Sequence, residues 1–201
     1  MQQVVIIWGG DVFETYDQYL DNLRKRSVRP FDKRLSWRNN IADELGDSYQ
    51  VMVPEMPCKW FADYVAWKIW FERHIEHIID PQPIYIGWSL GTTFLLKYLT
   101  ENTPKIAPSQ LHLVSSYVTN SHPWEVLGSF EFELTKTPII TSIVPKVHLW
   151  HSTDDTIVPY SDCEILHNHM PTSIIHTFSD RWHFIQENFP ELVATIKWQT
   201  I

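Results

Sequence analysis

A short motif in the middle of the chain has the residue types and spacing of a nucleophilic serine. Residues 87–91 read GWSLG, so Ser89 lies between two glycines in a G-x-S-x-G pattern. In this motif the serine occupies a sharp, strained turn from a strand into a helix, which exposes its hydroxyl oxygen. The flanking glycines let the strand and the helix approach closely because they have no Cβ atom. The motif predicts that Ser89 attacks a carbonyl carbon; the alternative is a glycine-flanked turn with a solvated serine.

A serine nucleophile needs a base to take its proton and a further group to orient that base. Two downstream segments carry such groups, HSTDDTIVP at residues 151–159 and SDRWHF at residues 179–184. With this kind of serine turn the chain order is serine, acid, histidine. We therefore predict that His183 is the base and that an aspartate of the first segment is the acid.

These groups must be held by a parallel sheet covered with helices, because short apolar runs alternate with longer helical stretches along the chain. The predicted fold class is α/β, a three-layer α/β/α sandwich with a mostly parallel sheet of about six strands, in a single domain over residues 1–201. Strands that end at one edge of such a sheet bring their loops together there. The predicted strands cover residues 4–8, 49–53, 84–86, 111–114, 147–150 and 173–178, and the predicted helices cover residues 32–45, 61–79, 90–100 and 184–198.

One stretch fits this alternation poorly. Residues 120–146 contain prolines at 123, 138 and 145 and several aromatic residues. They predict an irregular, cap-like excursion between two strands, with an ordinary loop anchored in the core as the alternative.

Four segments resemble a known family. GWSLG at 87–91, DDTIVP at 154–159 and RWHF at 181–184 are similar to the α/β-hydrolase family, and most of all to its small, lid-poor retinoblastoma-binding-protein-like serine hydrolases. VMVPEMP at 51–57 is similar to the same branch. The resemblance implies an α/β-hydrolase fold with a minimal cap.

The resemblance also implies a catalytic triad of Ser89, Asp155 and His183. The family pattern D-x-x-V-P places the acid at Asp155, with Asp154 as the alternative. The family usually has glycine immediately before the histidine, whereas this chain has Trp182. Because glycine adopts backbone conformations that tryptophan rarely does, this difference bears on the conformation of the loop that carries His183.

The predicted oxyanion hole uses two backbone amides, those of Leu90 and Gly10. Leu90 follows the serine, and Gly10 lies in a Trp-Gly-Gly segment at residues 8–10, where the family usually has His-Gly-x. The change from histidine to tryptophan does not remove a backbone donor. Three aromatic residues are predicted to line the substrate pocket: Trp88, Trp124 and Phe130.

Composition narrows the classes of partner. The chain has 201 residues, 44% of them hydrophobic, and a net charge of −8 without a basic stripe, which argues against nucleic acid or an anionic membrane as partner. Its apolar runs are too short to cross a bilayer, and residues 1–10 lack the features of a secretory signal. Cys58 and Cys163 are expected to be buried free thiols. We expect a cytoplasmic protein with a small-molecule acyl substrate, no nucleic-acid partner and no membrane partner.

Histidine pairs at residues 74 and 77, and at 148 and 151, have a spacing that could suggest a metal site. The chain has no H-E-x-x-H motif, and residues 148 and 151 would point to opposite faces of a strand. We therefore predict no metal, and acyl transfer to a serine needs no organic cofactor.

The leading hypothesis is a serine hydrolase that cleaves a carboxylic ester, a thioester or an amide through an acyl-enzyme intermediate. A second hypothesis is a binding or interaction module that keeps the fold without turnover, since fold does not dictate function. A third is another chemistry of the same triad, such as perhydrolysis or acyl transfer to an alcohol. The natural substrate and the oligomeric state are left open by the sequence.

Overall fold

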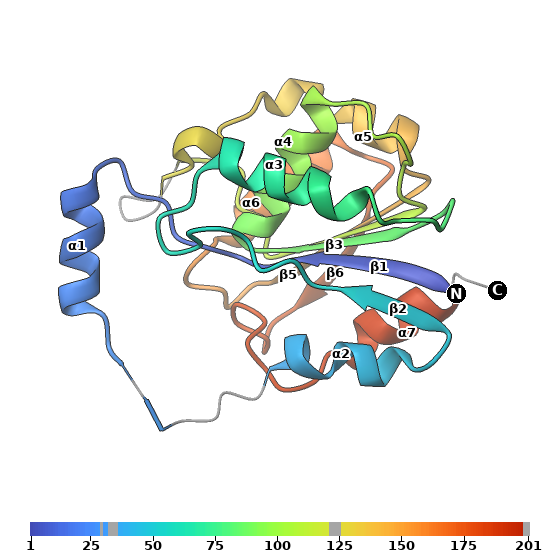
Figure 1. Cartoon of the computed structure of the whole chain (residues 1–201), viewed down its shortest axis with the longest axis horizontal. Helices are drawn as coiled ribbons and strands as arrows, with labels where there is room; N and C mark the ends of the chain where they lie inside the picture. The colour runs from blue at the N-terminus through green and yellow to red at the C-terminus, as the bar shows by residue number, and fades with distance from the viewer. Residues whose placement is uncertain (29, 32–35, 121–125, 199–201) are drawn as a thin grey trace.

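The structure, a computed structural model, describes residues 1–28, 30–31, 36–120 and 126–198. Within these residues a six-stranded, fully parallel sheet has the order β2-β1-β3-β4-β5-β6 (Figure 1). The strands are β1 (Gln2–Ile7), β2 (Tyr49–Met52), β3 (Ile84–Trp88), β4 (Gln110–Val114), β5 (Lys146–Ser152) and β6 (Ile174–Phe178). The predicted α/β sandwich with a parallel sheet of about six strands is confirmed.

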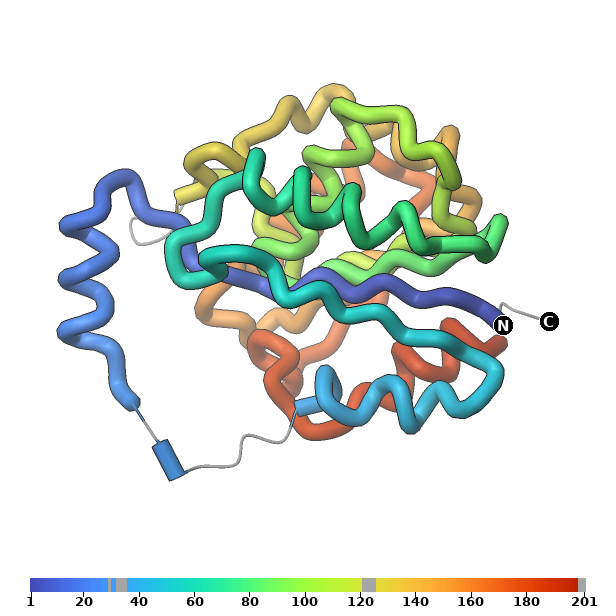
Figure 2. The backbone as a smooth tube through the Cα atoms, viewed as in Figure 1, coloured from blue at the N-terminus to red at the C-terminus, as the bar shows by residue number. Residues whose placement is uncertain are grey.

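Helices cover both faces of the sheet and make the outer two layers (Figure 2). The α-helices of the described residues are α1 (Tyr16–Lys25), which stands apart from these layers, α2 (Trp37–Leu45), α3 (Tyr64–Ile75), α4 (Leu90–Glu101), α5 (Pro138–Ile143), α6 (Tyr160–His169) and α7 (Pro190–Trp198). Helices α3, α4, α5 and α6 lie on one face, and α2 and α7 lie on the other. None of the helices in the described ranges has the length and apolarity needed to cross a membrane.

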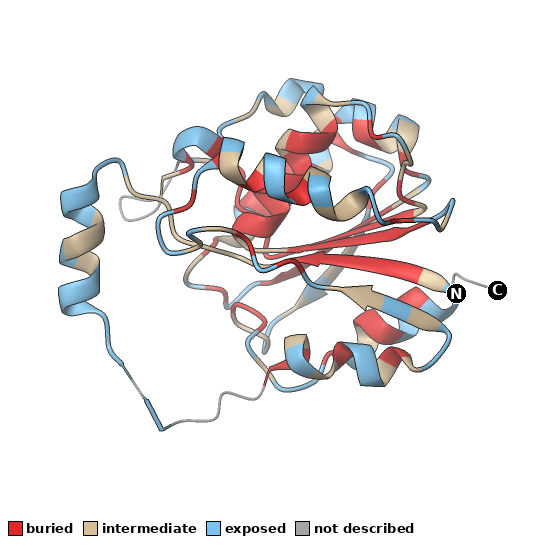
Figure 3. Ribbon diagram, in the orientation of Figure 1, coloured by how far each residue is buried: buried red, intermediate tan, exposed pale blue. Residues whose placement is uncertain are grey.

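The central strands are apolar at nearly every position because both faces of the sheet are covered. In β1, Val5 and Ile7 pack in the core under α3 and α4, whereas Val4 and Ile6 pack against α2 and α7. Successive side chains of a strand point to opposite faces, so one strand contributes to both cores. Figure 3 shows these strands as the most buried part of the molecule.

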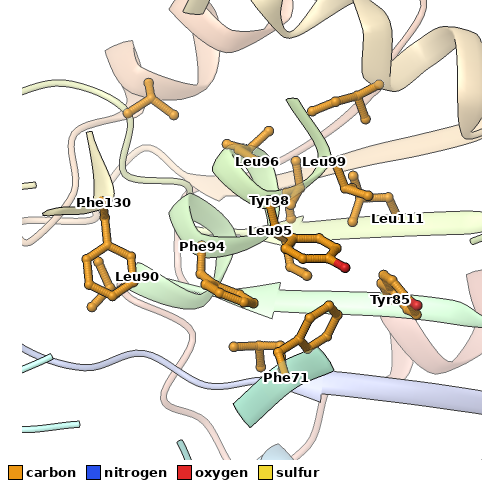
Figure 4. Packing of buried hydrophobic residues seen from close by; sticks show 14 of the residues in the cluster. Phe71, Tyr85, Leu90, Phe94, Leu95, Leu96, Tyr98, Leu99, Leu111 and Phe130 are labelled. Atoms are coloured by element: carbon orange, nitrogen blue, oxygen red, sulfur yellow. The ribbon is translucent and has the colours of Figure 1, made fainter. Parts of the chain in front are cut away.

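Helix α4 is held by an aromatic core (Figure 4). The ring of Phe71 on α3 lies 5.2 Å from that of Phe94 and 4.9 Å from that of Tyr98, both in edge-on contacts. Such contacts stabilise a pair beyond the area that it buries. Because α4 begins directly after Ser89, this core also fixes the turn that carries the serine.

Three of the four predicted helices are shorter than expected. Helix α3 begins at Tyr64, where the side chain of Asp63 accepts a hydrogen bond from the amide of Ala66. Helix α7 begins only at Pro190, because proline fits the first position of a helix and disfavours helical backbone in the residue before it. Phe184, where the predicted helix started, has a φ of 52°, which is not helical. Helix α2 occupies the end of the predicted range 32–45, of which residues 32–35 lie outside the described residues.

The irregular stretch at 120–146 contains two 3₁₀ turns, at Gly128–Phe130 and Leu134–Lys136, and helix α5. Phe130 and Ile140 are fully buried in the core beside α4. The described part of this stretch is therefore anchored in the α4 side of the sandwich.

The two cysteines are both free, but they differ in exposure. Cys163 on α6 is buried, and burial raises the pKa of its thiol to about 12. Cys58 is exposed, so the expectation of two buried thiols is wrong for this residue. It lies in the loop between β2 and α3 with a φ of 49°.

Candidate active site

Ser89 occupies the strained turn that the motif predicts. It lies between the end of β3 and the start of α4 with φ 54° and ψ −126°, a left-handed conformation that is unusual for serine. A Cβ atom on Gly91 would lie 2.1 Å from the carbonyl oxygen of Ile7, and one on Gly87 would lie 2.8 Å from that of Gly91. Both glycines are thus required by the close approach of β1, β3 and α4.

The predicted base and acid form a buried hydrogen bond. Nδ1 of His183 lies 2.8 Å from Oδ2 of Asp155, and the two residues are 4% and 7% exposed. The other oxygen, Oδ1, accepts hydrogen bonds from the amides of Ile157 and Val158. Burial opposes ionisation of Asp155, but the hydrogen bond and charge of His183 and these two amides outweigh it, so the pKa of Asp155 is lowered.

Trp88 connects the loop that carries His183 to the turn that carries Ser89. Its indole N–H donates a 2.9 Å hydrogen bond to the carbonyl oxygen of His183, and the two rings are 5.1 Å apart. The guanidinium of Arg38 lies 4.4 Å over the same indole. Trp88 directly precedes Ser89, so His183 is fastened to the neighbour of the nucleophile.

Asp154, the alternative acid, has a different position. Its Oδ1 accepts hydrogen bonds from the hydroxyl of Ser152 and from the amide of Trp182, the latter at 2.9 Å. The carboxylate of Asp154 therefore connects the loop after β5 (residues 153–159, the acid loop) to the loop after β6 (residues 179–184, the histidine loop), while the carboxylate of Asp155 contacts the imidazole.

The departure from the family pattern at Trp182 has a structural consequence. Trp182 has a φ of 45°, in the left-handed region that favours glycine. Its indole N–H donates a 2.7 Å hydrogen bond to the hydroxyl of Thr156 in the acid loop. The tryptophan keeps the backbone conformation of a glycine and adds a bond between the two loops.

A pair of substitutions at this position separates the backbone strain from the side-chain bond. Trp182→Gly and Trp182→Ala both remove the bond to Thr156, but only glycine adopts the left-handed conformation without a steric penalty. We expect Trp182→Gly to be more stable than Trp182→Ala by about 1 kcal/mol in urea unfolding. Equal stabilities, or a more stable alanine variant, would show that position 182 carries no such strain in solution.

A pocket of about 140 Å³ opens beside the serine. Ser89, Leu90 and Gly10 all line it, together with residues 11–13 and side chains that include Asn22 and Tyr117. Among the described residues the amides of Gly10 and Leu90 have no hydrogen-bond acceptor, as expected for Leu90 in the first turn of a helix. The two residues whose amides are predicted to form the oxyanion hole therefore line the same pocket as the serine.

None of the three aromatic residues predicted to line the pocket is found in its described lining. Trp88 packs against His183, and Phe130 is fully buried with its ring 5.1 Å from that of Trp67. Neither belongs to the described lining of the pocket, because their rings are packed against other residues of the protein. Trp124 lies outside the described residues.

Helix α1 supplies a pocket residue, Asn22, that the sequence reasoning missed. A local signal for this helix exists. The hydroxyl of Thr15 accepts a hydrogen bond from the amide of Gln18, and the side chain of Gln18 accepts one from the amide of Thr15. This is the T-x-x-Q form of a capping box, which marks the start of a helix.

Of the two histidine pairs with metal-like spacing, His148 and His151 lie on opposite faces of β5. His148 contacts His176 on one face, and His151 bonds the carbonyl oxygen of Val158 on the other. In the part of the chain that the structure describes, no group of three or more potential ligand side chains is arranged to hold a metal ion.

The sequence matches no protein-family model and no curated protein. Solved structures are similar to the chain in fold. The ydeN gene product of B. subtilis has a TM-score of 0.70 and 18% identity, with 100% of this chain and 99% of that chain covered. A serine hydrolase involved in carbazole degradation has a TM-score of 0.64 and 13% identity, with 99% and 90% covered. An esterase domain from Rhodothermus marinus has a TM-score of 0.61 and 14% identity, with 97% and 82% covered.

These similarities extend over nearly the whole chain at low sequence identity. Together with the sheet order and the turn at Ser89, they define the class of protein by its fold. The chain has the α/β-hydrolase fold.

Proposed function

We propose that this protein is a serine hydrolase that cleaves a carboxylic ester, a thioester or an amide of a small substrate. The observation that carries the proposal is the buried hydrogen bond between His183 and Asp155 beside the strained turn of Ser89. The similar solved structures of a serine hydrolase and of an esterase domain support the same class of reaction. The narrower similarity to the retinoblastoma-binding-protein-like branch, and a cytoplasmic location, remain predictions.

In the proposed reaction the hydroxyl oxygen of Ser89 attacks the carbonyl carbon, and its proton passes to Nε2 of His183. Asp155 accepts the Nδ1–H of the imidazole, which holds the required tautomer and stabilises the imidazolium. The amides of Gly10 and Leu90 stabilise the oxyanion of the tetrahedral intermediate, at about 3–4 kcal/mol for one such donor. The intermediate then expels the alcohol, thiol or amine, which takes the proton from His183.

The second half of the reaction regenerates the enzyme. Water loses a proton to His183 and attacks the ester formed on Ser89, and collapse of the second intermediate releases the carboxylic acid. An alcohol or hydrogen peroxide in place of water would give acyl transfer or perhydrolysis with the same groups. No metal or organic cofactor takes part in these steps.

The test is intact-mass spectrometry after incubation with a fluorophosphonate probe, with peptide mapping of the adduct. We expect one adduct on Ser89, absent from the Ser89→Ala variant, followed by turnover of short-chain p-nitrophenyl esters. If the folded wild-type protein forms no adduct, the proposal fails and the binding-module hypothesis takes its place. An adduct together with faster product formation when an alcohol is added would instead favour acyl transfer.

A further inference from the structure

Helix α1 is placed differently from every other helix in the described residues. It stands apart from the sandwich, and none of its residues is buried (Figures 1 and 3). One residue of this helix, Asn22, lines the pocket beside Ser89. A helix that packs on no core and still reaches the pocket is a candidate for substrate recognition.

Aromatic contacts fasten α1 to the rest of the molecule. The ring of Phe61, in the loop before α3, lies 5.4 Å from that of Tyr19 and 6.1 Å from that of Tyr16. Phe13, which also lines the pocket, has its ring 5.8 Å from that of Tyr19. These ring contacts connect α1 to the loop before α3 and to the wall of the pocket, which places Asn22 at the pocket.

The polar groups of the pocket are not equally available to a ligand. The carboxylate of Asp11 forms an ion pair with Arg26, whose guanidinium also lies 4.0 Å over the indole of Trp60. By contrast, the side-chain amide of Asn22 has no hydrogen-bond partner among the described residues. Asn22 can therefore donate to or accept from a bound molecule without losing an existing bond.

The position of the imidazole indicates which part of a substrate occupies this pocket. His183 must face the leaving group, because it donates the proton that the leaving group takes. His183 does not belong to the described lining, whereas Ser89 and both residues of the proposed oxyanion hole, Gly10 and Leu90, do. The part of the substrate next to Asn22 is therefore the acyl group.

Size and charge limit that acyl group. The pocket of about 140 Å³ is similar in volume to an engineered cavity of about 150 Å³ that holds one benzene molecule, so it fits about six or seven non-hydrogen atoms. Its described lining contains no basic side chain that could balance a carboxylate. A short, neutral acyl group fits these limits.

We propose that Asn22 is a specificity-determining residue, which hydrogen-bonds a neutral oxo or hydroxy group on a short acyl chain. This inference rests on the proposed function and names the substrate class of the same site. It predicts discrimination between two acyl groups of equal size that differ in a single polar atom.

The test compares p-nitrophenyl 4-oxopentanoate with p-nitrophenyl 4-methylpentanoate, which replaces the oxo oxygen by a methyl group. The ratio of the two kcat/KM values is measured in wild type and in Asn22→Leu. A neutral hydrogen bond contributes about 0.5–1.5 kcal/mol, so we expect the ratio in favour of the oxo ester to fall by about 3- to 10-fold in the variant. Because no α1 residue is buried, the variant should fold normally, which circular dichroism verifies.

A matched control makes the same substitution on another helix. Asn39 on α2 is exposed and does not line the pocket, so Asn39→Leu should leave the ratio unchanged. An Asn22→Leu variant that slows both esters equally, or leaves the ratio intact, would overturn the inference while hydrolysis itself persists. If wild type turns over neither ester and forms no fluorophosphonate adduct, the proposed function fails, and this inference with it.

Discussion

Replacing Asp155 by asparagine is expected to lower kcat/KM for a p-nitrophenyl ester by about 10,000-fold, the size of effect seen when the orienting aspartate of a serine triad is changed in this way. Oδ1 of the new side chain can still accept the amides of Ile157 and Val158, so the loop should keep its shape. The new amide group would face Nδ1 of His183, which must then accept a hydrogen bond. Its proton moves to Nε2, and the imidazole can no longer take the proton of Ser89.

The matched control is Asp154→Asn, the same change one residue earlier. Its side-chain oxygen can still accept the hydrogen bonds from Ser152 and Trp182, so we expect less than about a 10-fold change in kcat/KM. Initial rates at saturating and limiting ester concentrations, with urea unfolding of each variant, give the measurement. A larger loss for Asp154→Asn than for Asp155→Asn would identify Asp154 as the acid and contradict the assignment made from the geometry.

Acidification is expected to destabilise the fold through three stacked histidines. His112 on β4, His148 on β5 and His176 on β6 lie side by side, with ring centroids 4.7 Å apart for the first pair and 5.2 Å for the second. Nδ1 of His148 lies 2.9 Å from Nε2 of His176, so one of these nitrogens must be unprotonated to accept the bond. The indole of Trp150 donates to Nδ1 of His112, which must be an acceptor as well.

Burial and the neighbouring histidines lower the pKa of His112 well below its usual value, and burial and His148 lower that of His176 to about 4. As the pH falls below about 6.5, the unfolded chain takes up these protons before the folded protein does. The stabilisation is therefore complete above about pH 6.5 and declines toward pH 4. After allowance for partial exposure, His176 alone should account for a loss of about 2 kcal/mol over this range.

Urea unfolding at several values between pH 4 and pH 7 measures this loss. In His176→Gln the side chain can still bond His148 but no longer titrates, so the slope of unfolding free energy against pH should decrease by about one proton. The exposed His77→Gln serves as control and should keep the wild-type slope. If His176→Gln and wild type have the same slope, the stacked histidines do not set the acid stability.

The local signals in the sequence were sufficient for the architecture and for part of the site. All six predicted strands occur. A strand that is buried on both faces of a sheet is apolar at nearly every position, so it appears in the sequence as a short apolar run bounded by turn residues. The conformation at Ser89 was also predictable. In a tight strand-to-helix turn the backbone segments lie so close together that only glycine fits at positions 87 and 91. In both cases the cause lies within a few residues of the effect.

Other features were decided by the tertiary structure. Asp154 and Asp155 are chemically identical neighbours, and only the position of the histidine loop determines which one reaches His183. Phe130 was expected in the pocket but is buried in the core, and Asn22 was overlooked although it lines the pocket. Which side chains surround a cavity depends on contacts between segments far apart in the chain. Residue type and spacing therefore indicated the chemistry that we propose, while long-range packing determined which residues meet.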